Sequence, residues 1–201
     1  MKRSTIILLS LIGGFALLFA LLVFWSVGAY NRLVSLSEST ESQWANVQSA
    51  YQRRADLIPN LIATVKGYAD FEQETLKGVI EARSKATSVQ VNADELTPER
   101  IAAFQKAQSE LKGALSRLLV TVERYPDLKA NQNFLALQSQ LEGTENRINV
   151  ERDRFNEQVR GFNSAVKRIP TSIVASIGGF ESRGYFEAEG EAQEAPEVSF
   201  E

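Results

Sequence analysis

The stretch LKANQNFLALQSQLEGTENRINVERDRFNEQVRGFNSAVKRI, residues 128–169, decides the fold because large apolar side chains recur in it at every seventh position. The repeat consists of Phe134, Leu141, Ile148, Phe155, Phe162 and Ile169. Seven residues make nearly two turns of an α-helix, so these side chains share one face of a single helix, which Pro170 ends. No run from residue 30 to residue 170 alternates apolar and polar side chains as a half-buried strand does. The residues therefore predict an all-α fold.

A helix is also predicted immediately upstream of this segment. Thr97 offers an N-cap hydroxyl, and Pro98 suits the first helical position. Pro126 forces a turn at the other end, because a proline disfavours a helical residue before it. The apolar stripe of this helix consists of Ile101, Phe104, Leu111, Leu115, Leu118, Val122 and Tyr125. Residues 85–95 lose the stripe and are small or polar, which predicts a surface loop.

Pro59 leaves two topologies open. A proline inside a helix costs about 3 kcal/mol, which favours a break and two helices at roughly 29–56 and 58–86. The bundle would then have four long helices running up, down, up and down. Against the break, the seven-residue register passes through Pro59 without a phase shift. A kinked single helix would explain that register and would make a three-helix bundle. We favour the break and the four-helix bundle.

The N-terminal part of the chain predicts a membrane anchor. No charged residue occurs from Ser4 to Asn31, and residues 6–27 read IILLSLIGGFALLFALLVFWSV. At about 1.5 Å per residue this segment is long enough to cross about 30 Å of hydrocarbon. A cleaved signal peptide is the alternative, but its apolar region is usually only about 7 to 15 residues long.

Charges beside this segment predict its orientation. Lys2 and Arg3 precede it and only Arg32 follows closely, so the positive-inside rule places the N-terminus in the cytoplasm. We expect the anchor to cross a membrane with the bundle on the exported side. The expected divisions are a cytoplasmic N-terminus and anchor at 1–28, a helical bundle at 29–169, and an apolar strap with an acidic tail at 170–201.

Composition excludes most familiar catalytic sites. The chain has no histidine and no cysteine, so disulfides, thiolate nucleophiles, Cys/His zinc sites and Ser-His-Asp triads are ruled out. The formal net charge of −3 argues against nucleic acid as a partner. The sequence contains no Gly-rich phosphate loop, and we expect no cofactor and no metal.

Charged and amide side chains near Pro59 and in the middle of the last helix form a candidate polar belt. Its members are Arg53, Arg54, Asp56, Asn60, Glu145 and Arg152. If the first and last helices are antiparallel with Trp44 beside Phe155, Arg54 falls opposite Glu145. Buried charges must be paired, so we interpret the belt as structural. The alternative is that Asp56 and Glu145 act as an acid and a base, or as ligands of a hard cation.

The C-terminal residues change in composition. Residues 171–180 are predominantly apolar and predict a strap that packs on the bundle or lies at the membrane surface. Residues 181–201 contain seven glutamates and one arginine, which predicts a largely disordered tail. The candidate docking points in it are Tyr185, Phe186 and Phe200, offered to a basic groove on another protein. A tail that only improves solubility is the alternative.

Several long motifs, in the same order along nearly the whole chain, resemble those of LemA family proteins. They are YNRLV (30–34), RRADLIPNL (53–61), VKGYA (65–69), YPDLKAN (125–131), LEGTENRI (141–148) and YFEA (185–188). The resemblance implies a single-pass membrane protein with a helical-bundle body and no established catalytic activity. We therefore expect a noncatalytic scaffold anchored in the inner membrane of a bacterial cell. Its expected partners are the lipid bilayer and either copies of itself or a membrane protein. The alternatives are a regulator of a membrane protease or transporter and a carboxylate-based envelope enzyme.

Overall fold

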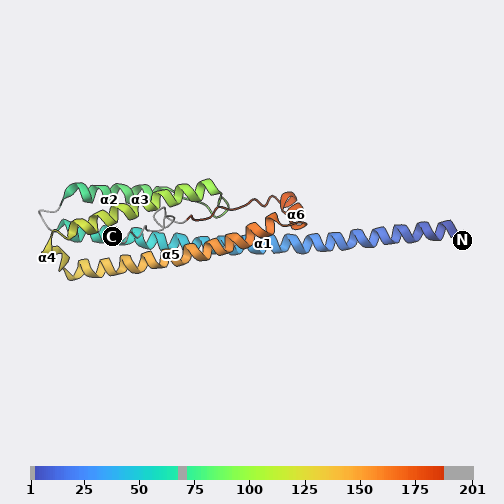
Figure 1. Cartoon of the computed structure of the whole chain (residues 1–201), viewed down its shortest axis with the longest axis horizontal. Helices are drawn as coiled ribbons and strands as arrows, with labels where there is room; N and C mark the ends of the chain where they lie inside the picture. Colours follow the sequence, from blue (N-terminus) through green and yellow to red (C-terminus); the bar gives the residue numbers. More distant parts are fainter. Residues whose placement is uncertain (1–2, 68–71, 188–201) are drawn as a thin grey trace, which may run out of the picture.

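Long α-helices make up most of the chain, as the seven-residue repeats predict (Figure 1). The structure is a computed structural model and describes residues 3–67 and 72–187. Its helices are α1 (Arg3–Lys66), α2 (Gln73–Ser88), α3 (Pro98–Val122), α4 (Pro126–Lys129), α5 (Gln132–Lys167) and α6 (Thr171–Gly178). Within the described ranges there is no strand. The predicted all-α class is confirmed.

Four helices form an antiparallel bundle, and one of them extends far beyond it. In Figure 1, α1 runs the whole length of the molecule, α2 turns back along it, α3 reverses again, and α5 returns beside α1. The most extensive contacts join α1 to α5 and α2 to α3. The N-terminal part of α1 projects from the bundle alone.

The register of α1 against α5 follows the sequence prediction. The ring centroids of Trp44 and Phe155 lie 5.3 Å apart, and Arg54 pairs with Glu145. The repeat on α5 is buried from Phe134 to Phe162. Its last member, Ile169, is exposed, because α5 ends at Lys167 and the chain turns away from the buried face.

Pro59 does not break α1, so the predicted division at residues 56–58 is wrong. The helix continues to Lys66, and the chain turns back between Lys66 and Gln73. A proline has no amide to donate to the carbonyl four residues earlier, which here belongs to Ala55. Arg83 Nε of α2 donates to that oxygen at 2.9 Å instead. A side chain from the neighbouring helix therefore replaces the missing backbone donor, and the four-helix arrangement is reached with a later first turn.

The connection between α2 and α3 is more buried than its polar composition predicts. Residues 85–88 belong to α2, and Val91 and Leu96 in the following loop are buried in the core. The carbonyl oxygen of Val91 accepts hydrogen bonds from Trp44 Nε1 at 3.0 Å and Gln48 Nε2 at 3.1 Å. A buried indole needs an acceptor, so the loop is fixed on α1 by this pairing. The other side chains from 89 to 95 are exposed or half-buried, so the predicted surface connection is correct except that residues 85–88 are helical and Val91 is buried.

The N-terminal part of α1 is long and apolar enough to cross a membrane. Its large apolar side chains from Ile7 to Val27 are all exposed, and none packs in the core of the bundle. A helix that is apolar all round and has no protein neighbours suits hydrocarbon better than water. No break in α1 separates this segment from the bundle.

Candidate functional site

Arg54 is the centre of the polar belt. It is buried, and its Nη1 donates to Glu145 Oε2 at 3.0 Å while its Nη2 donates to Gln108 Oε1 at 2.7 Å. The other Glu145 oxygen lies 3.3 Å from Lys112 Nζ. Arg54 also stacks on Tyr51, with 5.1 Å from Cζ to the ring centroid. Three helices, α1, α3 and α5, are thereby joined through one guanidinium group.

Of the remaining residues of the predicted belt, Arg152 lines the same small pocket as Arg54 and Glu145, and its Nη2 donates to the carbonyl oxygen of Glu187 at 2.9 Å. The other three do not converge on this point. Arg53, Asp56 and Asn60 are exposed, and Asp56 accepts from Gln52 Nε2 of its own helix at 2.7 Å. Asp56 and Glu145 thus have separate partners. No group of three or more Asp, Glu, His or Cys residues suited to a metal is found in the described part of the chain.

Glu151 is a buried carboxylate that the sequence interpretation missed. Its side chain is 1% exposed, and Gln43 Nε2 of α1 donates to Oε2 at 2.6 Å. Arg147 Nε and Arg154 Nη1 lie 2.7 and 3.3 Å from Oε1, on either side of it along α5. The signal that identifies it is its position, because Glu151 falls between Ile148 and Phe155 at apolar-stripe spacing. Its charge is fully paired, so it joins α1 to α5.

An extended segment, residues 181–187, lies along α3 and α5. The name strap is used for this segment from now on, because most of the apolar strap predicted at 171–180 forms the helix α6. Three amide side chains each bind one residue of the strap through its backbone N–H and its backbone carbonyl together. Asn163 binds Arg183, Asn156 binds Phe186, and Gln105 binds Glu187, with all six hydrogen bonds between 2.8 and 3.0 Å. Reciprocal amide pairing satisfies the backbone of an isolated extended segment much as a neighbouring strand does.

The side chains of the strap hold it in place as well. The Phe186 ring lies among Trp44, Phe104 and Phe155 at centroid distances of 5.5 to 6.4 Å, and Arg152 Cζ lies 5.0 Å from its centroid. Arg183 Nη2 donates to Glu41 Oε1 at 2.6 Å. At Gly184 a Cβ atom would lie 2.7 Å from Pro98 Cα, so only glycine fits there.

These contacts correct the predicted C-terminal tail. Residues 181–187 are ordered on the bundle, and Phe186 is 4% exposed, so it docks within its own chain and is not free for a partner. Tyr185 is 42% exposed, and Phe200 lies outside the described residues. Acidic composition predicts disorder only when the backbone lacks partners, and here the amides supply them. The seven-residue spacing of Asn156 and Asn163, which puts both amides on one face of α5, was the sign in the sequence that α5 could bind an extended segment.

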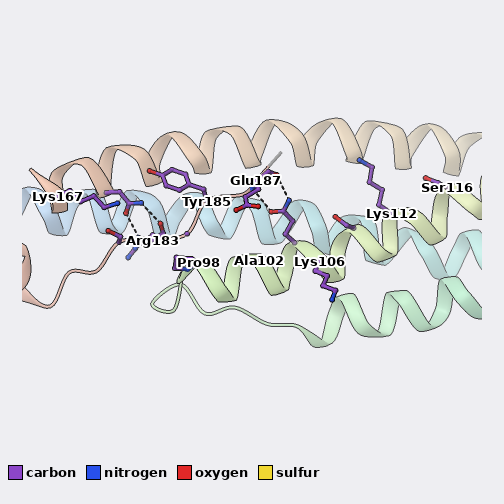
Figure 2. Close-up of a pocket in the computed structure, with 15 residues that line it drawn as sticks. Pro98, Ala102, Lys106, Lys112, Ser116, Lys167, Arg183, Tyr185 and Glu187 are labelled. Carbon is purple, nitrogen blue, oxygen red and sulfur yellow. Dashed lines mark hydrogen bonds between the residues drawn. The ribbon is translucent and has the colours of Figure 1, made fainter. Parts of the chain in front are cut away.

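A groove is lined by α3, the strap, and Asn163 and Lys167 of α5, and it continues along α3 past the end of the strap (Figure 2). Its volume is about 890 Å³. Figure 2 shows Lys112 and Ser116 farther along α3, beyond Glu187. The α3 wall carries small and basic side chains, namely Ala102, Lys106, Ser109, Lys112, Gly113 and Ser116. The basic side chains along this wall are Lys106 and Lys112, and Lys112 also pairs with Glu145.

One surface carboxylate near this wall has a shifted pKa. Lys85 Nζ lies 2.6 Å from Glu110 Oε2 and donates a hydrogen bond to it. That hydrogen bond, with the charges of Lys85 and Lys106, holds the pKa of Glu110 below its ordinary value. Because the carboxylate is exposed, the pair stabilises the fold only slightly.

Comparison with known proteins gives one family and several curated relatives. The model of the LemA family matches residues 43–200. Protein LemA of Metamycoplasma hominis is 28% identical over 162 residues, which cover 80% of this chain and 70% of that protein. Magnetosome protein MamQ of Magnetospirillum gryphiswaldense is 25% identical over 174 residues, which cover 78% of this chain and 64% of that protein. The matched residues thus span less than two thirds of this magnetosome relative.

Proposed function

Since this chain belongs to the LemA family, we propose that it is a noncatalytic scaffold anchored in a membrane, which associates with copies of itself or holds a partner beside the bilayer. The apolar part of α1 is the anchor, and the bundle is the binding body. The observation that carries the proposal is the groove between α3 and α5, where side-chain amides already hold one extended segment by its backbone.

The groove supports a role in binding polypeptide. Backbone pairing through Asn and Gln amides is independent of the bound sequence, as in strand addition at a sheet edge. Beyond Glu187 the groove is open, and Lys106 and Lys112 line it. An extended segment with carboxylate side chains would complement that part of the groove, whether it comes from a second copy or from another membrane protein.

The location proposed for this scaffold follows from the flanking charges. Lys2 and Arg3 before the apolar segment, against Arg32 alone close after it, support a cytoplasmic N-terminus and a bundle on the exported side of a bacterial inner membrane. The chain has no cysteine, so the variant Val120→Cys carries a single thiol on the bundle. We expect a membrane-impermeant maleimide to label it in cells whose inner membrane is intact. Labelling only after the inner membrane is broken would show that the bundle lies in the cytoplasm, which contradicts the proposed orientation.

The test of the scaffold is the mass and composition of the particle after gentle detergent extraction of the full-length protein. We expect a discrete homo-oligomer or a complex with one partner in fixed stoichiometry. A clean monomer without a companion would contradict the proposal. The identity of a stoichiometric partner also separates a scaffold from a regulator of a protease or transporter.

A matched pair of variants connects the association to the groove. Gly113 on the groove wall and Gly143 on α5 both have open space where a side chain would begin. Gly113→Trp fills the groove, so the complex should dissociate while the helix content and Tm stay close to those of the native chain. Gly143→Trp should leave the complex intact. If both variants lose the complex equally, or both retain it, the groove is not the site of association.

A further inference from the structure

The short helix α6 lies at the end of the bundle from which the apolar part of α1 projects (Figure 1). It contacts both α1 and α5, and Ala175 is its buried residue. Phe180, just after α6, packs on Tyr30 of α1 with 5.5 Å between ring centroids. Because the apolar segment ends at about Val27, α6 lies at the level where the chain would leave the hydrocarbon.

An apolar stripe on and beside α6 is exposed. Ile169, Ile173 and Ile177 are spaced four residues apart and are 81%, 61% and 84% exposed. Elsewhere on the bundle, Ile80, Leu135 and Val150 are each less than half exposed, and Val120 on α3 is a single residue exposed to 71%. Single exposed apolar residues are ordinary, but Ile173 and Ile177 share one face of α6 and Ile169 lies two residues before that helix. Three highly exposed isoleucines within nine residues mark an interaction surface.

Basic side chains lie at the same level. Trp44 of α1 packs beside Phe155 of α5. Because these helices are antiparallel, Arg32, twelve residues before Trp44, lies at the same level as Lys167, twelve residues after Phe155. Arg168 follows directly, and all three side chains are exposed. An apolar stripe with cations beside it is the pattern of a segment that lies in a lipid surface, with the apolar side at the acyl boundary and the cations at the phosphates.

We propose that α6 with Ile169 is a second membrane contact of this chain, inserted into the surface of the same bilayer that α1 crosses. Lipid is the group that covers this stripe, because the stripe lies at the level where the apolar segment of α1 ends. This inference rests on the proposed membrane anchoring. The bundle is then attached to the membrane at two points, α1 and α6, which lie at the same end of the bundle.

Spin labels test this contact on the full-length chain, which has no native cysteine. Ile177→Cys carries a nitroxide label, and the protein is reconstituted into vesicles of phosphatidylethanolamine and phosphatidylglycerol. Power saturation compares collisions with oxygen, which concentrates in lipid, and with a water-soluble nickel chelate. We expect the oxygen-to-nickel ratio at Ile177→Cys to be several-fold higher than at a water-exposed control.

Two positions of equal exposure give the controls. Phe15 in the apolar segment and Val120 on α3 are both 71% exposed in the protein alone. We expect Phe15→Cys to favour oxygen and Val120→Cys to favour nickel. If Ile177→Cys behaves like Val120→Cys while Phe15→Cys favours oxygen, the α6 contact is wrong and the anchor stands. If Phe15→Cys also favours nickel, the anchor itself is wrong and the inference fails with it.

Discussion

Polar residues at apolar-stripe positions set how the helices of this bundle align. Gln108 falls between Phe104 and Leu111 on α3, and Glu151 falls between Ile148 and Phe155 on α5. Each is buried, and each binds a side chain of α1. A register shift would leave these groups buried without partners, at a cost of several kcal/mol. They therefore specify one alignment among several that apolar contacts alone would permit.

Replacing Glu145 tests the pairing of the buried Arg54. Glu145→Ala removes the carboxylate and leaves the guanidinium with Gln108 as its acceptor. We expect the free energy of unfolding to fall by about 2 to 3 kcal/mol, less than for a fully buried pair because Glu145 is partly exposed. Thermal unfolding followed by circular dichroism measures it. Glu142→Ala, an exposed neighbour on α5, should change Tm little, and an equal effect of both variants would contradict the pairing.

At the scale of helices, Pro59 and Arg83 should be energetically coupled. Arg83→Met removes the donor to the Ala55 carbonyl and should cost about 1 to 2 kcal/mol. In a Pro59→Ala background the backbone amide at 59 supplies that donor, so the same change should cost about 1 kcal/mol less. A double-mutant cycle on unfolding free energies measures the difference. Additive costs would show that Arg83 does not replace the proline's missing bond.

The strap provides a comparison of two adjacent aromatic residues. Phe186→Ala empties a site among Trp44, Phe104 and Phe155 and should lower the unfolding free energy by about 3 to 5 kcal/mol. It should also speed hydrogen exchange at the Gly184 amide, which donates to Leu96 O at 2.8 Å. Tyr185→Ala, at an exposed side chain, should cost less than about 1 kcal/mol. If the two variants behave alike, the strap does not stabilise the bundle.

Features that follow from the seven-residue spacing of the helices were predictable from the sequence, and features that depend on contacts outside that spacing were not. The seven-residue stripe identified the buried face of α5 and, by counting along antiparallel helices, the pairing of Arg54 with Glu145. The tolerance of Pro59 depends on Arg83, which reaches it from α2. The order of the strap depends on amides from α3 and α5. Neither partner is local, so proline and acidic composition indicated a break and a disordered tail.

At the scale of the whole molecule, the two tryptophans should report different surroundings. Trp25 is exposed at the end of the apolar segment, whereas Trp44 is buried and lies 19 positions farther along α1, about 28 Å. In vesicles with brominated acyl chains, fluorescence of the Trp44→Phe variant, which retains Trp25, should be strongly quenched. The Trp25→Phe variant should be quenched little. Equal quenching would show that the membrane boundary does not lie near residue 25.

Because α1 is one continuous helix, a change in the tilt of its apolar segment also tilts the bundle. The part of α1 from Tyr30 to Lys66 extends about 55 Å beyond the apolar segment. A transmembrane helix adjusts to bilayer thickness by changing its tilt, and a straight rigid helix carries the same angle along its whole length. A tilt change of about 10° would sweep the far end of the bundle sideways by about 10 Å, since sideways travel equals arm length times angle. With α1 anchored in a membrane as proposed, thinning or thickening of the bilayer would move a surface far from the lipid sideways.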